Sequence, residues 1–123
     1  MSENVNLLPV RPIADSYWVI PEHFLAGEYP GSYFSTDLTR RCLNVFIQSG
    51  FTTMIDLTAE DEVGRYEGIL HEQAEHYGVA VFYRRFPIVD FGLPSRELML
   101  NILDAIDIAL VNGQKIYLHC HGG

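Results

Sequence analysis

The residues best suited to chemistry stand together at positions 119–123, which read His-Cys-His-Gly-Gly. The apolar run at 116–118 leads directly into them, so we expect a buried strand to deliver Cys120 to the start of a loop. A thiol attacks as its thiolate, which converging backbone N–H groups favour, and the same groups bind phosphoryl oxygens. Glycines let such a backbone approach an anion closely. The pattern indicates a cysteine nucleophile in an anion-binding loop; the alternative is a buried, unreactive cysteine beside a glycine turn.

A second reactive side chain, Asp90, lies in the segment VDFGLP at positions 89–94. A carboxyl group on a glycine-hinged loop can close over a bound ester and protonate the leaving group. Ser95 follows this segment and is a good residue to cap the start of a helix. The alternative is therefore that Asp90 only begins a turn that leads into this helix.

Both segments resemble parts of the cysteine-dependent protein tyrosine phosphatases. The letters H-C-x-x-G open the signature H-C-x-x-G-x-x-R of that family, and D-x-G-x-P is similar to its mobile acid loop, W-P-D-x-G-x-P. Ile88 and Val89 stand where the family has Trp and Pro. Residues 18–21, 25–31, 55–58 and 86–88 resemble, in the same order, stretches of small bacterial phosphatases of the dual-specificity-like group.

The resemblance implies roles for the individual residues. Cys120 would attack phosphorus, and Asp90 would protonate the leaving group and then activate water. His119 would support the loop from behind without touching the substrate. The resemblance implies neither a cofactor nor a metal, and the implied partner is a phosphorylated protein or a small phosphomonoester. The loop amides that would hold the phosphoryl oxygens are those of His121, Gly122 and Gly123.

The arginine of the signature falls beyond Gly123. We therefore expect this chain to match the amino-terminal part of the family's domain, without its C-terminal helices, and to be inactive alone. Residues 1–16 would form an irregular arm, and residues 17–123 would belong to a single catalytic domain. One alternative is a truncated, catalytically dead fragment or non-enzymatic remnant. Another is a rhodanese-like sulfur transferase, against which the D-x-G-x-P loop argues.

Composition narrows the class of protein. A chain of 123 residues with 48% hydrophobic residues can bury one core. The formal net charge of −8 disfavours binding to nucleic acid or to an anionic membrane. The sequence has no long apolar segment of the kind that spans a membrane. Cys42 and Cys120 do not show the spacing of a disulfide framework, so we expect reduced thiols and a cytoplasmic location.

Hydrophobic periodicity predicts strands at 17–20, 24–26, 52–57, 79–85 and 115–118, and helices at 35–49, 64–77 and 95–111. This alternation predicts an α/β fold with a mostly parallel central sheet flanked by helices, in agreement with the phosphatase resemblance. Cys120 would then lie beyond the carboxyl end of a strand, where such sheets bind ligands. The predicted inward face of the first helix is Leu38, Cys42, Val45 and Phe46, and that of the last is Leu98, Ile102, Ala105, Ile106 and Ala109.

Other polar residues carry weaker signals. His71 and His76 resemble a zinc motif but are five residues apart, which turns them about 140° from each other on a helix. Adjacent residues such as His119 and Cys120 point opposite ways on an extended chain, so we predict no metal site there. Arg84 and Arg85 precede the acid loop, where a solvated or paired role is favoured over substrate binding. Phosphotyrosine, phosphoserine or phosphothreonine, and inositol phosphates all stay open as substrates.

Overall fold

The computed structural model describes residues 9–32, 34–59, 66–88 and 94–120. The predicted elements are present, with bounds that differ by a few residues. The fourth strand begins at Phe82, three residues after its predicted start, because the backbone N–H of Val79 still donates to Ala74 at the end of the preceding helix. The second helix begins at Glu67, and its predicted start at residue 64 lies outside the described residues. The elements in chain order are β1 (Ser16–Ile20), β2 (Phe24–Gly27), α1 (Thr36–Gln48), β3 (Thr53–Asp56), α2 (Glu67–Tyr77), β4 (Phe82–Arg85), α3 (Arg96–Val111) and β5 (Ile116–His119).

The strands form one sheet in the order β1-β2-β5-β3-β4, in which only the β1–β2 pair is antiparallel among the described residues. This confirms the mostly parallel sheet that the sequence predicts. The last strand, β5, lies at the centre, between β2 and β3. The register places Gly27, His119 and Asp56 side by side at the carboxyl ends of the three central strands. Any side chain that follows these positions therefore emerges at one edge of the sheet.

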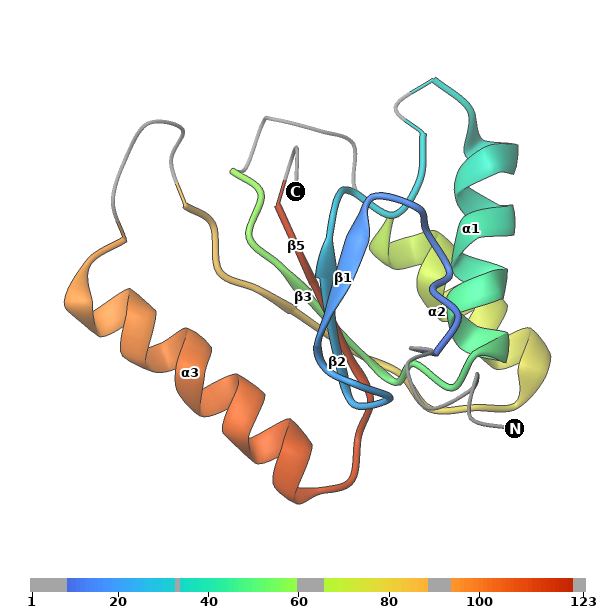
Figure 1. Ribbon diagram of the computed structural model, residues 1–123. Coiled ribbons are helices and arrows are strands. Elements are labelled where there is room, and N and C mark those ends of the chain that lie inside the picture. Colours follow the sequence, from blue (N-terminus) through green and yellow to red (C-terminus); the bar gives the residue numbers. More distant parts are fainter. Residues whose placement is uncertain (1–8, 33, 60–65, 89–93, 121–123) are drawn as a thin grey trace.

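Helices cover both faces of the sheet (Figure 1): α1 and α2 lie on one side and α3 on the other. The buried core is correspondingly divided into two clusters. One joins α1 and α2 to the sheet through residues such as Leu43, Phe46 and Leu70. The other joins α3 to β3 and β5, and it contains the face predicted for this helix, with Ile102, Ala105, Ile106 and Ala109 buried and Leu98 partly buried.

The inward face of α1 differs in part from the predicted one, since Phe46 is buried as predicted but Leu38 and Val45 are not. Its buried residues are Thr39, Leu43, Phe46 and Ile47, whereas Leu38 and Val45 are 52% and 42% exposed. The predicted and the observed inward residues both recur with helical spacing, so periodicity alone does not show which of them are buried. Thr39 occupies the inner face because its hydroxyl donates to the Ser32 carbonyl and accepts from the Ser32 N–H at 3.0 Å. Cys42 is half-buried against the first cluster, as predicted for a small core residue.

Helix ends follow the local sequence. The side chain of Ser95 caps α3 by accepting the N–H of Leu98 at 3.0 Å, and Ser35 caps α1 in the same way. Gly78 ends α2 with a φ of 69°, a left-handed conformation that favours glycine. In the part of the chain that the structure describes, no helix combines the length and the apolar character needed to cross a membrane.

Candidate active site

Two of the predicted site residues lie within the described part of the chain. His119 is the last residue of β5, and Cys120 follows it at the carboxyl edge of the sheet. Their position agrees with the prediction that a buried strand delivers the cysteine. The other predicted site residues, Asp90, His121, Gly122 and Gly123, lie outside the described residues.

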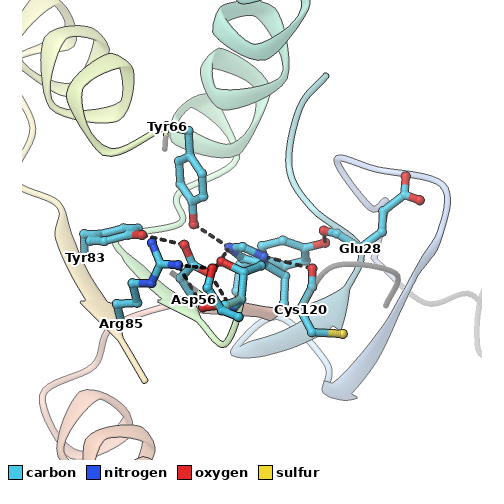
Figure 2. A network of polar contacts seen from close by, with 10 residues as sticks. Glu28, Asp56, Tyr66, Tyr83, Arg85 and Cys120 are labelled. Carbon is cyan, nitrogen blue, oxygen red and sulfur yellow. Dashed lines mark hydrogen bonds and ion pairs between the residues drawn. The ribbon is translucent and has the colours of Figure 1, made fainter. Parts of the chain in front are cut away.

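The thiol of Cys120 is half-buried, and its sulfur points away from a cluster of polar side chains behind it (Figure 2). Cys120 and this cluster lie on opposite sides of the main chain at the end of β5. The cluster can act on that sulfur through the backbone of Cys120 and through His119.

His119 is completely buried at the centre of this cluster. Its Nε2 lies 2.6 Å from the hydroxyl of Tyr66, and its Nδ1 lies 3.3 Å from the carbonyl oxygen of Cys120. The rings of Tyr29 and Tyr117 pack against the imidazole, with centroid distances of 6.0 and 5.8 Å. Burial lowers the pKa of His119, although the nearby Asp56 carboxylate and the Cys120 carbonyl act in the opposite direction. The geometry thus favours a neutral imidazole.

Asp56, the last residue of β3, is the buried carboxylate of the cluster. Its Oδ1 accepts the N–H of Thr58 at 2.9 Å and the Thr58 hydroxyl at 2.6 Å, while its Oδ2 accepts the hydroxyl of Tyr83. The Oδ1 atom lies 3.9 Å from Nε2 of His119. The chain turns sharply after β3 because Asp56 binds the residue two positions ahead. The carboxylate is thereby satisfied without a direct bond to the histidine.

Arg85, at the end of β4, fixes the same turn from the other side. Its guanidinium donates to the carbonyl oxygens of Thr58, at 2.9 Å, and of Ala59. Its Nε is buried with no partner among the described residues. Arg85 is therefore a paired structural arginine, as the sequence favoured. Arg84 instead lies on the exposed side of the strand, with its guanidinium carbon 5.1 Å from the centroid of the Phe86 ring.

The end of β2 is joined to β5 by a further tyrosine. The hydroxyl of Tyr117 donates to the carbonyl oxygen of Glu28, which directly follows β2. Burial raises the pKa of Tyr117, and partial burial together with the neighbouring Asp15 raises that of Glu28. This contact holds the edge of the sheet beside Cys120 in a fixed position (Figure 2).

The sequence reasoning missed the polar cluster. Tyr66 is completely buried and contacts His119. One signal was available: Asp56 stands within the apolar strand that reads Thr-Met-Ile-Asp, and a buried carboxylate requires donors. The sequence does not say which donors these are, because Tyr83 and Thr58 meet Asp56 only in the folded sheet. In the part of the chain that the structure describes, no three His, Cys, Asp or Glu side chains are grouped to hold a metal.

The family of the chain follows from comparison with known proteins. The sequence model of the family described as "Polymorphic toxin system, DSP-PTPase phosphatase" matches residues 30–123. The chain belongs to this family of phosphatase domains. The family match agrees with the resemblance seen in the sequence and does not favour the sulfur-transferase alternative. A comparison with curated protein sequences gave no significant match.

Solved structures of phosphatases share the fold. Tk-PTP in its active form is 24% identical to this chain, with a TM-score of 0.63 over 89% of the chain and 63% of Tk-PTP. Kinase associated phosphatase, with its catalytic-site cysteine changed to serine, is 20% identical, with a TM-score of 0.63 over 81% of this chain and 57% of that one. A putative phosphatase (DUF442) from Shewanella putrefaciens CN-32 is 16% identical, with a TM-score of 0.65 over 99% of this chain and 65% of that one.

These likenesses establish a phosphatase fold for the described elements. The chain spans between 57% and 65% of the length of these three structures. The class of fold and the family are therefore defined.

Proposed function

We propose that the protein hydrolyses phosphomonoesters through a cysteinyl-phosphate intermediate. The observation that carries this proposal is the position of Cys120, directly after the central strand β5, with the buried His119 contacting its carbonyl oxygen at 3.3 Å. Because Cys120 directly follows a hydrogen-bonded strand, the sheet holds the backbone of the proposed nucleophile in position. The family match supplies the class of reaction.

In the first step, Sγ of Cys120 attacks phosphorus as a thiolate. A sulfur–phosphorus bond forms while the bond from phosphorus to the leaving oxygen breaks, and Asp90 gives its proton to that oxygen. In the second step, Asp90 takes a proton from water, whose oxygen attacks phosphorus. The sulfur–phosphorus bond then breaks, which releases phosphate and restores the thiolate.

The remaining residues hold these reacting groups in place. The backbone amides of His121, Gly122 and Gly123 form a phosphate-binding loop around the three non-bridging oxygens. His119 is a positioning residue, since it is buried and acts on Cys120 through the carbonyl oxygen. Glycines in this loop let its amides turn toward the anion.

The substrate that we propose is a phosphorylated protein or a small phosphomonoester, and we assign no cofactor or metal to the reaction. We place the protein in the cytoplasm, because a reducing compartment favours an unpaired catalytic thiol. We also propose that residues 17–123 belong to one catalytic domain. The arm before β1 is tied to it, since Nε1 of Trp18 donates to the carbonyl oxygen of Pro9 at 2.8 Å.

The proposal is tested with the gene product expressed in full, so that any residues after Gly123 are included. It should hydrolyse p-nitrophenyl phosphate in the presence of EDTA and be inhibited by vanadate. Cys120→Ser should abolish turnover, because an alcohol is a far weaker nucleophile than a thiolate at neutral pH. Acid quenching during turnover should trap phosphate on the unaltered protein.

The matched control is Cys42→Ser, which removes the other thiol of the sequence from the side of the sheet that α1 covers. This variant should keep its turnover. Substantial phosphatase activity in Cys120→Ser, or equal losses in both cysteine variants, would contradict the assignment of Cys120 as the nucleophile.

A further inference from the structure

A buried carboxylate lies close to a histidine that the site requires to be neutral. Asp56 is 2% exposed and His119 is completely buried, with 3.9 Å between Oδ1 and Nε2. An uncompensated carboxylate at that distance favours the charged form of an imidazole. A neutral His119 therefore requires neighbouring groups that reduce the effect of the Asp56 charge on the protonation of Nε2.

The position of the proton on His119 follows from Tyr66. The hydroxyl of Tyr66 is buried, and the acceptor that the structure gives it is Nε2 of His119, at 2.6 Å. Because a buried hydroxyl donates wherever an acceptor is available, Tyr66 donates to Nε2, and the ring proton lies on Nδ1. From there it points at the carbonyl oxygen of Cys120, 3.3 Å away. This tautomer is the one that fixes the Cys120 peptide.

A second proton on His119 would disrupt this arrangement. It would occupy Nε2 and convert Tyr66 from donor to acceptor, which would leave the Tyr66 hydroxyl proton buried without a partner. The Asp56 carboxylate favours this doubly protonated imidazole, whereas the groups that donate hydrogen bonds to Asp56 disfavour it. Two of these donors come from Thr58, within the same turn, and the third comes from Tyr83, on the neighbouring strand β4.

The other titratable and charged groups around His119 come from every element packed against it. Arg85 on β4 lowers the pKa of His119, whereas Asp56 on β3 raises it. Tyr66 precedes α2 and Tyr29 follows β2. Tyr117 lies on β5 two positions before His119, and Cys120 directly follows the strand. Among them, Asp56 is the one anion in the described part of the site that faces the imidazole. Burial is the largest influence that lowers the pKa of His119, and Asp56 is the neighbouring charge that opposes it most.

We propose that Tyr83 and Asp56 form a positioning pair, in which the hydrogen bond from Tyr83 offsets the charge of the Asp56 carboxylate. His119 then stays neutral, with its proton on Nδ1, and holds the carbonyl group of Cys120. Neither residue touches the substrate: Asp56 is buried, and the sulfur of Cys120 points away from both (Figure 2). Tyr83 donates to the carboxylate and so disperses the charge that would otherwise draw a second proton to the imidazole. The catalytic consequence of this pair rests on the proposed phosphatase function.

The test uses two substitutions with opposite expected effects. Tyr83→Phe removes one donor from Asp56 but leaves both donors of Thr58, so the apparent pKa of His119 should rise by about one unit, within the range that a nearby charge produces. Asp56→Asn removes the charge with almost no change of shape, so the apparent pKa should fall. The double variant should lie close to Asp56→Asn, because Tyr83 acts through the carboxylate.

The measurement is an NMR titration of the imidazole nitrogens in the full gene product, which also reports whether Nδ1 or Nε2 carries the proton. Tyr77→Phe is the matched control, since its hydroxyl accepts from Gln48 at an exposed position on α2. It should leave the titration of His119 unchanged. If Asp56→Asn does not fold, the comparison of Tyr83→Phe with Tyr77→Phe still tests whether the Tyr83 hydroxyl lowers the pKa of His119.

A proton on Nε2 in the unaltered protein, or an unchanged His119 titration in Tyr83→Phe, would overturn the proposal. Turnover gives a separate result. In an active enzyme, Tyr83→Phe should move the acid limb of the pH–kcat profile to higher pH, in parallel with the imidazole. If the unaltered protein shows no Cys120-dependent turnover, the proposed function fails, while the titration still judges the positioning pair.

Discussion

The hydroxyl of Tyr117 lies 2.7 Å from the point where a Cβ on Gly27 would stand. Gly27 ends β2 and pairs with His119 on β5, so the missing side chain makes room beside the candidate active site. The carbonyl oxygen of Asp15 and the Cβ of Ser16 close the same space, at 2.6 and 2.7 Å. Only glycine fits there without displacing the tyrosine that binds the Glu28 carbonyl.

Gly27→Ala should therefore destabilise the protein by about 1–3 kcal/mol, the usual cost of overpacking a filled core. Chemical denaturation followed by circular dichroism measures this loss. The matched control is Gly68→Ala in the first turn of α2, where a Cβ would meet no atom within 4 Å. That change should be neutral, or stabilising by up to about 1 kcal/mol, because alanine favours a helix. Equal effects of the two substitutions would contradict the close packing at Gly27.

Stability should fall as the pH rises above about 9. Burial raises the pKa of Cys42 to about 11 from 9.0 and raises the pKa values of Tyr66, Tyr83 and Tyr117 above their ordinary value of 10.0. The unfolded chain therefore loses these protons first, so the stability that these neutral groups contribute below their unfolded pKa values is lost as the pH rises.

Urea denaturation between pH 8 and 11 tests this dependence. Cys42→Ala should give a shallower decline between pH 9 and 11, by up to about one proton released on unfolding. Native Cys42 should also react slowly with iodoacetamide at pH 8, since little of it is thiolate. Rapid alkylation of Cys42 in the folded protein, or an unchanged slope in the variant, would refute the interpretation.

Asp90→Asn should lower kcat by about 10²–10⁴-fold for esters with poor leaving groups, the range expected for a positioned general acid. It should have less effect on p-nitrophenyl phosphate, because p-nitrophenolate leaves readily without a proton. Steady-state kinetics of the full gene product on phenyl and p-nitrophenyl phosphates measures the difference. Asp104→Asn, at an exposed position of α3, is the control and should leave both rates unchanged. Equal losses on both esters would indicate a structural role for Asp90.

Ser95→Ala should destabilise the protein by about 1 kcal/mol, because the N–H of Leu98 loses the acceptor that caps α3. Ser95→Asp should retain most of the stability, since aspartate caps a helix equally well. Thermal unfolding of the two variants provides the comparison. If both substitutions cost the same, the cap is not what Ser95 contributes.

The sequence by itself determined the order of the elements and the position of Cys120 directly after a buried strand. The alternation of apolar strands and helices predicted a mostly parallel sheet, and the apolar run before His119 predicted that Cys120 follows a buried strand. These features depend on local pattern, because the period of apolar residues and the capping residues act within a few positions of one another. The family resemblance likewise rested on short segments whose order along the chain is visible in the sequence.

Only the tertiary structure decided which face of α1 is buried and what surrounds His119. Leu38 and Leu43 both lie on apolar helical stripes, and the stripe that contains Leu43 is the one on the side where Thr39 and Ser32 exchange hydrogen bonds. Tyr66 stands 53 positions before His119, and Tyr83 stands 27 positions after Asp56. No local pattern links such residues, because their hydrogen bonds exist only after the parallel strands have brought the carboxyl ends of β3, β4 and β5 to one edge of the sheet.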